Sequence, residues 1–165
     1  RKEIVDKYGI SKVKAIVEGG KERYHSVFEG LKQTSDADYV LIHDGARPFV
    51  NQDIIRRCMQ EVQKYQACVV GMPVKDTIKI ADEEGYAKQT PDRKNVWMIQ
   101  TPQTFSYALI YEAYEEMLKT EDTAITDDAM VLERIKGKKS KLIEGSYRNI
   151  KITTPEDLLI ANVYL

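Results

Sequence analysis

Side chains of the types that bind phosphates or cations follow the apolar runs of this chain. Asp44 and Arg47 come directly after the apolar run 39–43, and Lys151 lies in a short run near the last predicted helix. A carboxylate is a suitable ligand for a hard divalent cation such as Mg²⁺, and a planar guanidinium can clamp a phosphate. The alternatives are structural: Asp44 as a turn cap, an Arg47–Asp44 ion pair, and a solvated Lys151.

Glycines and hydroxyl side chains supplement this set. The pair Gly19-Gly20 would let the backbone approach a ligand closely or would simply form a turn, and Ser26 follows on a predicted helix. Thr126 precedes a helical stretch and is expected to cap that helix, with acids in its first turn. A hydroxyl at a helix N-terminus can also contact a phosphate, because the free amides there attract anions.

Other chemistries lack support. The two histidines, His25 and His43, have no companion at ligand spacing, and His43 is expected to be a structural imidazole. Cys58 and Cys68 do not form a C-x-x-C motif, so zinc and redox sites are unsupported. The sequence also contains neither a G-x-S-x-G elbow nor a Walker phosphate loop.

The elements that would position these residues alternate along the chain. Apolar runs at 13–17, 39–43 and 67–72 predict strands, with predicted helices after Gly20 and at about 53–65. This alternation predicts an α/β fold with a mostly parallel sheet and helices on both faces. In such sheets ligands bind beyond the carboxyl ends of the strands, so several of the polar groups above would converge at one edge.

The second half of the chain begins with a polar segment. Residues 75–96 have the pattern of a hairpin with a turn at Glu83-Glu84-Gly85, too polar to bury itself and expected to lie on the sheet or reach a partner chain. Helices follow at about 106–119 and 126–136, with strands predicted at 141–143 and 149–153. The last helix opens with Thr154-Pro155, a cap followed by a first-turn proline.

Composition limits the class of protein. The 165 residues hold 25 Lys and Arg against 26 Asp and Glu, which is unsuited to a general nucleic-acid coat. No apolar run approaches the length of about 18 residues that a membrane span needs, and no secretory leader opens the chain. We therefore expect one domain over residues 1–165 in a cytoplasmic protein, with no nucleic-acid or membrane partner.

Six segments in order resemble one enzyme family. They are VEGGKERYHSVFEGL (17–31), VLIHDGARPFV (40–50), PVKDTIK (73–79), TPDRKNVWMIQTPQTF (90–105), AITDDAMVLE (124–133) and EGSYRNIKITTPEDL (144–158). Together they resemble the 2-C-methyl-D-erythritol 4-phosphate cytidylyltransferases of non-mevalonate isoprenoid synthesis. The resemblance implies a Rossmann-like nucleotidyltransferase fold and Mg²⁺-dependent transfer of CMP from CTP to the sugar-alcohol phosphate, with release of pyrophosphate. It also implies a homodimer that exchanges hairpin arms, here about 75–96.

The resemblance assigns roles to individual positions. Asp44, Arg93 and Lys151 match catalytic positions, and Asp44 also matches the metal site. Positions that match substrate-binding residues are Gly20, Ser26, Gly45, Arg47, Thr77, Thr101 and Thr126. Among these residues, Gly20 and Ser26 match contacts to the cytosine base. Arg93 and Thr77 match residues supplied by the arm to the neighbouring subunit.

One departure from the family pattern bears on activity. The family opens with a strand and a glycine-rich loop whose arginine, followed by a lysine, holds the triphosphate, and no segment of these residues matches it. We therefore expect residues 1–165 alone to be inactive and to leave an apolar sheet edge open. Two other readings stay open: a ribitol-5-phosphate cytidylyltransferase, and a non-catalytic nucleotide-binding scaffold of the same fold.

Overall fold

A four-stranded mixed sheet forms the centre of the protein. The computed structural model describes residues 2–120 and 124–165. The strands are β1 (Tyr39–Ile42), β2 (Ala67–Pro73), β5 (Trp97–Ser106) and β6 (Lys141–Glu144), in the order β1-β5-β2-β6. β5 pairs antiparallel with β1 and β2, whereas β2 pairs parallel with β6. Three strands thus share one direction and β5 opposes them. The α/β class is confirmed. Among the described strands only the β2–β6 pair is parallel, so the sheet is mixed rather than mostly parallel, because β5 runs antiparallel between β1 and β2.

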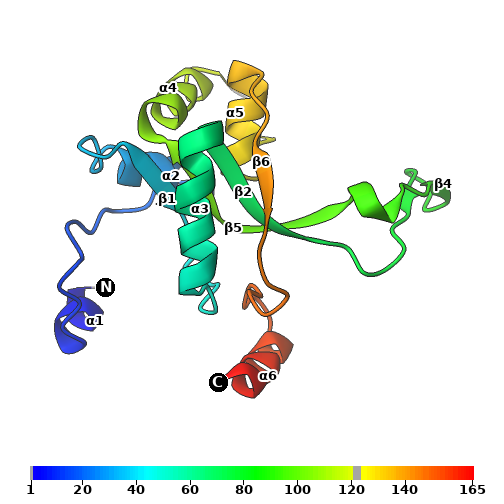
Figure 1. Ribbon diagram of the computed structural model, residues 1–165, viewed down its shortest axis with the longest axis horizontal. Helices are drawn as coiled ribbons and strands as arrows, with labels where there is room; N and C mark the ends of the chain where they lie inside the picture. Colours follow the sequence, from blue (N-terminus) through cyan, green and yellow to red (C-terminus); the bar gives the residue numbers. More distant parts are fainter. Residues whose placement is uncertain (1, 121–123) are drawn as a thin grey trace.

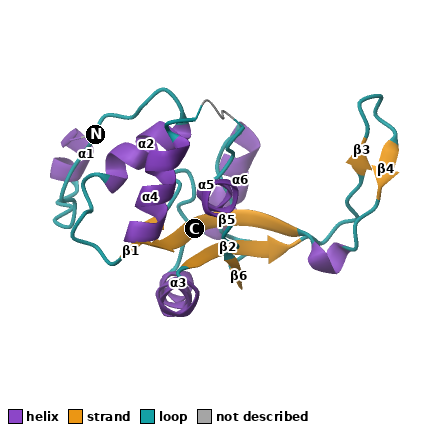
Figure 2. Cartoon of the chain, turned by 90° about the horizontal axis from the view of Figure 1, so that it is seen from above, coloured by secondary structure: helices purple, strands orange, loops and turns teal. Residues whose placement is uncertain are grey.

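Helices cover both faces of this sheet, as the alternating pattern predicts. α2 (Arg23–Leu31), α4 (Tyr107–Met117) and α5 (Asp128–Lys136) lie on one face, and α3 (Gln52–Tyr65) lies on the other (Figure 2). β2 contributes to both cores: Val69 packs in the cluster on the first face, while Cys68 and Val70 pack in the cluster under α3. A strand buried on both faces explains its continuous apolar run.

Two helices lie at the periphery. α1 (Lys2–Lys7) and α6 (Pro155–Tyr164) stand apart from the sheet (Figure 1). α6 starts with a capping box in which Thr154 and Asp157 satisfy each other's backbone amides, with Pro155 in the first turn. The ring of Phe49 meets that of Tyr164 edge-on at 5.5 Å between centroids. No helix in the described ranges is long and apolar enough to cross a membrane.

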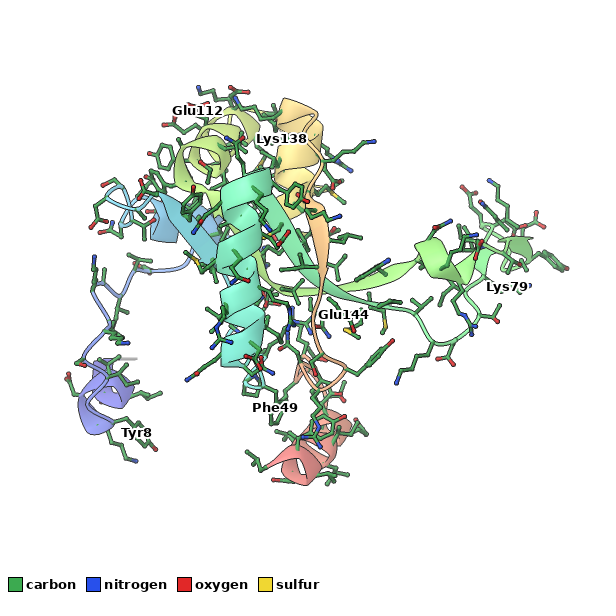
Figure 3. The ribbon with its side chains drawn as sticks, viewed as in Figure 1. Tyr8, Phe49, Lys79, Glu112, Lys138 and Glu144 are labelled. Carbon is green, nitrogen blue, oxygen red and sulfur yellow. The ribbon has the colours of Figure 1, made fainter. Side chains whose placement is uncertain are left out.

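The polar segment 75–96 forms a hairpin outside the main sheet. β3 (Ile80–Ala81) and β4 (Ala87–Gln89) pair antiparallel, and the 3₁₀ helix η1 (Arg93–Asn95) leads back to β5. Gly85, at the expected turn, has a φ of 88°, which favours glycine. Figure 1 shows the hairpin away from every α-helix, and Figure 3 shows Lys79, which belongs to the hairpin segment, far from Glu144 at the end of β6.

Two predicted strands are wrong. Residues 13–17 form no ladder with any described segment, and Val13 and Ile16 are exposed. Without a neighbour to pair their backbone groups, apolar residues do not make a strand. Residues 149–153 instead attach to the loop after β1 by separate bonds, one from the Ile152 amide to the Ala46 carbonyl (2.8 Å) and one from the Arg47 side chain to the Asn149 carbonyl (2.8 Å).

The longest strand, β5, was not predicted from the sequence. Its middle carries Gln100, Thr101 and Gln103, which are polar yet buried. The structure satisfies them individually: the Gln103 side chain accepts from the Ala129 amide and donates to Asp127, each at 2.9 Å. Buried polar groups are tolerated when they are hydrogen-bonded. Because these partners are distant in sequence, residues 97–106 do not show the apolar pattern by which a buried strand is predicted.

Candidate active site

The candidate site is built around the carboxylate of Asp44, directly beyond β1. Its Oδ2 lies 3.0 Å from Nζ of Lys151 and 3.8 Å from Nε of Arg47, and its Oδ1 lies 3.4 Å from Nη2 of Arg23. Three cations from three separate segments thus surround one carboxylate. Asp44 and Lys151 meet as the α/β topology predicts, and Lys151 is not merely solvated.

A hydrogen-bonded chain holds the backbone of this loop. Nε2 of His43 lies 3.0 Å from the Arg47 carbonyl oxygen, which only accepts, so Nε2 carries the hydrogen. Nδ1 therefore accepts from the Thr101 hydroxyl at 2.9 Å. The oxygen of the Thr101 hydroxyl in turn accepts from the Asp44 amide at 3.1 Å. His43 is thus a satisfied structural imidazole, as expected, and the Thr101 hydroxyl is already engaged in positioning Asp44.

Arg47 chiefly binds backbone. Its Nη1 donates to the Asn149 carbonyl at 2.8 Å and its Nη2 to the Ile99 carbonyl at 3.4 Å. Its Nε is buried without a hydrogen-bond acceptor among the described residues. Arg47 therefore joins the Asp44 loop, β5 and the Lys151 segment, and it keeps one donor available on the side of Asp44.

The surrounding cations set the charge of Asp44. Partial burial raises the pKa of Asp44, but the Lys151 hydrogen bond and the charge of Arg23 outweigh it, so the pKa lies below its usual value. Burial lowers the pKa of Arg47, partly offset by Asp44. An arginine stays protonated in proteins, so the site presents an ionised carboxylate among cations.

These groups line a cavity of about 250 Å³. Five of the predicted site residues line it: Asp44, Arg47, Thr101, Thr126 and Lys151. The other lining residues are Arg23, Ile99, Gln100, Gln103 and Asp127. Cationic and hydroxyl groups in one small cavity are suited to a phosphorylated ligand. The structure thus brings these five residues together, whereas Gly20, Ser26, Gly45, Thr77 and Arg93 do not line this cavity.

A second, larger cavity of about 620 Å³ lies between α2 and β1 and includes Ser26 and Gly45. The Ser26 hydroxyl accepts from the Gly20 amide at 3.1 Å. A Cβ atom on Gly20 would lie 2.3 Å from Cβ of His25, so this turn requires glycine. β1 is an end strand in the order of the described sheet, and the apolar residues of this cavity lie beside it.

The cap of α5 differs from the prediction. Asp127, rather than Thr126, is the N-cap, and its side chain accepts from the Met130 amide at 2.8 Å. The Thr126 hydroxyl contacts only the sulfur of Met130, at 3.9 Å, among the described partners. Thr126 therefore lines the smaller cavity with a hydroxyl that a ligand could use.

Arg93 and Thr77 lie apart from this cluster. Neither lines the two cavities, and Arg93 donates to the Lys75 carbonyl at 2.8 Å at the base of the hairpin. Within one chain they cannot act at Asp44. Their assignment to the site of a neighbouring subunit stays a prediction.

Arg23 was not considered from the sequence, although it contacts Asp44 and lines both cavities. The only local feature that could have pointed to Arg23 is its position at the start of a helix, four residues after Gly19. Its partners, Asp44 and Asp128, are distant in sequence, so only the folded chain reveals its position.

The donor set around Asp44 bears on the expected Mg²⁺. The described residues contain no group of three or more His, Cys, Asp or Glu side chains that could hold a metal by themselves. Mg²⁺ in nucleotide sites is usually held by one or two carboxylates together with substrate phosphates and water. Asp44 and Asp127 both line the cavity, but the Asp127 side chain is bonded to Gln103 and to the Met130 amide. Asp44 as the main carboxylate ligand is compatible with that arrangement.

Comparison with known proteins gives one consistent family. The sequence profile described as 2-C-methyl-D-erythritol 4-phosphate cytidylyltransferase matches residues 3–165. A protein of that name from Lachnospira eligens is 54% identical over 156 residues, covering 94% of this chain and 69% of the relative. One from Alkaliphilus oremlandii is 52% identical over 166 residues, covering 100% of this chain and 70% of the relative.

Solved structures agree. The crystal structure of 4-diphosphocytidyl-2C-methyl-D-erythritol synthase from Anaerococcus prevotii superposes with a TM-score of 0.89 at 39% identity, over 98% of this chain and 73% of that one. The cytidylyltransferase structure from Thermus thermophilus gives 0.80 at 32% identity, over 93% and 78%. The match of residues 3–165 and these identities place the chain in the 2-C-methyl-D-erythritol 4-phosphate cytidylyltransferase family.

Proposed function

We infer that this protein transfers the cytidylyl group of CTP to 2-C-methyl-D-erythritol 4-phosphate, releasing pyrophosphate, as an enzyme of isoprenoid biosynthesis. The observation that carries this function is the family match over residues 3–165, combined with the cluster of Asp44, Arg47 and Lys151 at the cavity. The relatives carry the methylerythritol name, so neither the ribitol phosphate enzyme nor the scaffold is favoured.

The reaction consists of an in-line attack by a phosphate oxygen of the alcohol phosphate on the α-phosphorus of CTP. Two polyanionic substrates must approach each other, so positioning and neutralisation of charge provide most of the catalysis. Lys151 and the buried Nε of Arg47 can each bind a phosphate oxygen beside Asp44. The Thr126 hydroxyl, which lines the same cavity, can add a neutral donor.

Asp44 is the residue that would hold Mg²⁺. The ion, when bound, supplies positive charge to the phosphate oxygens of CTP. Asp44 keeps a low pKa and therefore stays ionised for this purpose. Lys151, at 3.0 Å, would exchange part of its contact with Asp44 for contact with a phosphate.

Ser26 and Gly45 line the larger cavity, whereas Gly20 does not line it and is linked to it through its bond to Ser26. Gly20 and Ser26 are proposed to bind the cytosine base there. The Gly20 amide and the Ser26 hydroxyl are bonded to each other in this structure. Both are positioned to exchange that bond for bonds to a pyrimidine edge.

We further propose a homodimer through the hairpin, with Arg93 and Thr77 delivered to the neighbouring site. The hairpin supports this arrangement because two short strands alone are marginal in water and the ring of Tyr86 is 71% exposed. An arginine fork recognises a phosphate by two parallel hydrogen bonds. Arg93 would thus bind the alcohol phosphate held by its partner.

Pyrophosphate release tests the activity. The full-length gene product is incubated with CTP, Mg²⁺ and either 2-C-methyl-D-erythritol 4-phosphate or ribitol 5-phosphate. We expect release with the first alcohol and little with the second. Turnover of ribitol 5-phosphate alone would establish the alternative substrate, and binding of CTP with no turnover of either would establish a scaffold.

A further inference from the structure

Arg23 connects the candidate active site to a buried carboxylate that no role assigned above uses. Asp128, at the start of α5, is fully buried, and so is Tyr114 of α4. Arg23, at the start of α2, is the only cation paired with Asp128 among the described ion pairs, and it also faces Asp44. Three helices therefore meet at one arginine beside the cavity.

The two edges of the Arg23 guanidinium have different partners. Nη1 and Nη2 bind both oxygens of Asp128, at 2.9 and 2.8 Å, in a bidentate pair. Nε and Nη2 face Oδ1 of Asp44, each at 3.4 Å. The first edge is thus held tightly in a buried position, and the second reaches the site.

The buried carboxylate is itself held. The Tyr114 hydroxyl donates to Oδ1 of Asp128 at 2.5 Å. Burial raises the pKa of Tyr114, and so does the neighbouring charge of Asp128, so the phenol remains a donor. Burial lowers the pKa of Arg23, but the hydrogen bond and charge of Asp128 outweigh this and raise it. The chain Tyr114–Asp128–Arg23 is thus a fixed, charged support.

Asp44 needs such a support. Lys151 approaches only Oδ2, from a flexible four-carbon side chain, while Oδ1 has Arg23 as its only described ion-pair partner. A carboxylate held at one oxygen can rotate about its side-chain bonds. A rigid arginine at the second oxygen fixes the plane of the group.

We propose that Arg23 is a positioning residue that fixes the orientation of the Asp44 carboxylate, and that Asp128 and Tyr114 hold Arg23 in place. The expected loss of kcat/KM rests on the proposed function, whereas the expected orientation of the Asp44 carboxylate does not. Arg23 acts through Asp44, so its contribution disappears when Asp44 is already removed.

A double-mutant cycle tests the inference. Arg23→Lys keeps the charge and lets Asp128 remain paired, but a lysine cannot serve two carboxylates with a fork. We expect it to lower kcat/KM about 10- to 100-fold, mostly in kcat, since small misplacements of catalytic groups cost this much. In an Asp44→Asn background the same change is expected to lower it less than about twofold. Equal losses in both backgrounds would overturn the proposal.

Two controls separate positioning from folding. Arg56→Lys alters an arginine paired with Asp53 on the exposed face of α3 and is expected to leave kcat/KM unchanged. Arg23→Gln combined with Asp128→Asn removes both charges without leaving one buried alone. That double variant is expected to fold, as judged by thermal unfolding, and to show the kinetic loss of Arg23→Lys. Full activity in it would contradict the role of Arg23.

A crystal structure of the Arg23→Lys variant gives a readout independent of turnover. The inference predicts that the Asp44 carboxylate rotates away from its present orientation while the backbone of residues 43–47 stays in place. An unchanged carboxylate would overturn the inference. If the native protein transfers no cytidylyl group, the proposed function fails, and this crystallographic comparison still decides whether Arg23 positions Asp44.

Discussion

The Asp44 cavity and the hairpin arm are built in opposite ways. Around the cavity, side chains from α2, β5, α5 and the segment after β6 bind one another, and Asp44 alone faces three cations. In the hairpin, β3 and β4 bind chiefly each other, and Ile80 and Tyr86 are exposed. The cavity is held together by contacts within one chain, whereas the polar hairpin has few contacts within the chain and is the part that we propose binds a partner. The matched site residues are divided between these two regions.

The largest expected effect is at the centre of the cavity. Asp44→Asn keeps the size of the side chain but removes its charge, so Lys151 and Arg47 lose their shared counter-charge and Mg²⁺ loses its carboxylate. We expect kcat to fall on the order of 10²- to 10³-fold, measured by pyrophosphate release. Asp53→Asn, an exposed acid of α3, is the matched control. Near-normal turnover by Asp44→Asn would mean that the cavity is not the reaction site.

The arm is expected to affect one substrate selectively. Arg93→Ala removes a charge-assisted phosphate contact worth about 1.5–3 kcal/mol. The KM for the alcohol phosphate should therefore rise about 10- to 100-fold, with a much smaller change for CTP. Lys94→Ala, the adjacent exposed position, serves as the control in the same steady-state assay. Equal changes for both substrates would contradict the assignment of the arm.

The two regions should also differ in stability. Gln103→Leu deprives the Ala129 amide and Asp127 of their partner in a buried setting. We expect the free energy of unfolding to fall by about 1–3 kcal/mol. Tyr86→Ser in the exposed hairpin should change it by less than about 0.5 kcal/mol, as measured by urea unfolding. A hairpin variant as damaging as Gln103→Leu would show that the arm is part of the folding unit.

The smallest effect is expected at the end of the segment that carries Lys151. The backbone amides of Thr153 and Thr154 donate to Asp157, and these bonds lower its pKa. The pKa is lower in the folded than in the unfolded state, so the stabilisation is present above the ordinary carboxyl pKa. It is lost as the pH falls below about 4. Thermal unfolding of Asp157→Asn and of the native protein should therefore converge in acid, and a constant difference down to low pH would argue against it.

The sequence predicts much of this architecture. Short apolar segments identified β1, β2 and β6, and helical patterns identified α2 to α6. The predicted cap is correct for α6 but not for α5. Asp44 and Arg47, which follow β1, line one cavity as the position after a strand predicts, whereas Lys151 reaches this cavity from a segment after β6 that forms no strand. These features depend on local periodicity and on the geometry of α/β sheets, both of which are present in a single sequence.

What could not be predicted depends on contacts between distant residues. β5 is polar because Gln100, Thr101 and Gln103 bind groups from other segments. Arg23 acquires its place from Asp128, which is 105 residues away. Residues 13–17 have the composition of a strand but no pairing segment in the described ranges. A local sequence pattern cannot predict hydrogen-bonding or pairing partners that are this distant in sequence.

The central claim is that each site combines the cavity of one chain with Arg93 of another, and mixed subunits test it most directly. Arg93→Ala and Lys151→Ala proteins are unfolded together, refolded at equal amounts and assayed at an alcohol phosphate concentration well below the native KM, where each protein alone is expected to have little activity. If the residues act from different chains, a mixed dimer has one site with both residues intact, and about half of the dimers are mixed, so activity should recover to about a quarter of the native value. If both residues act within the same chain, or if no dimer forms, the mixture stays as inactive as its components, and the account is contradicted.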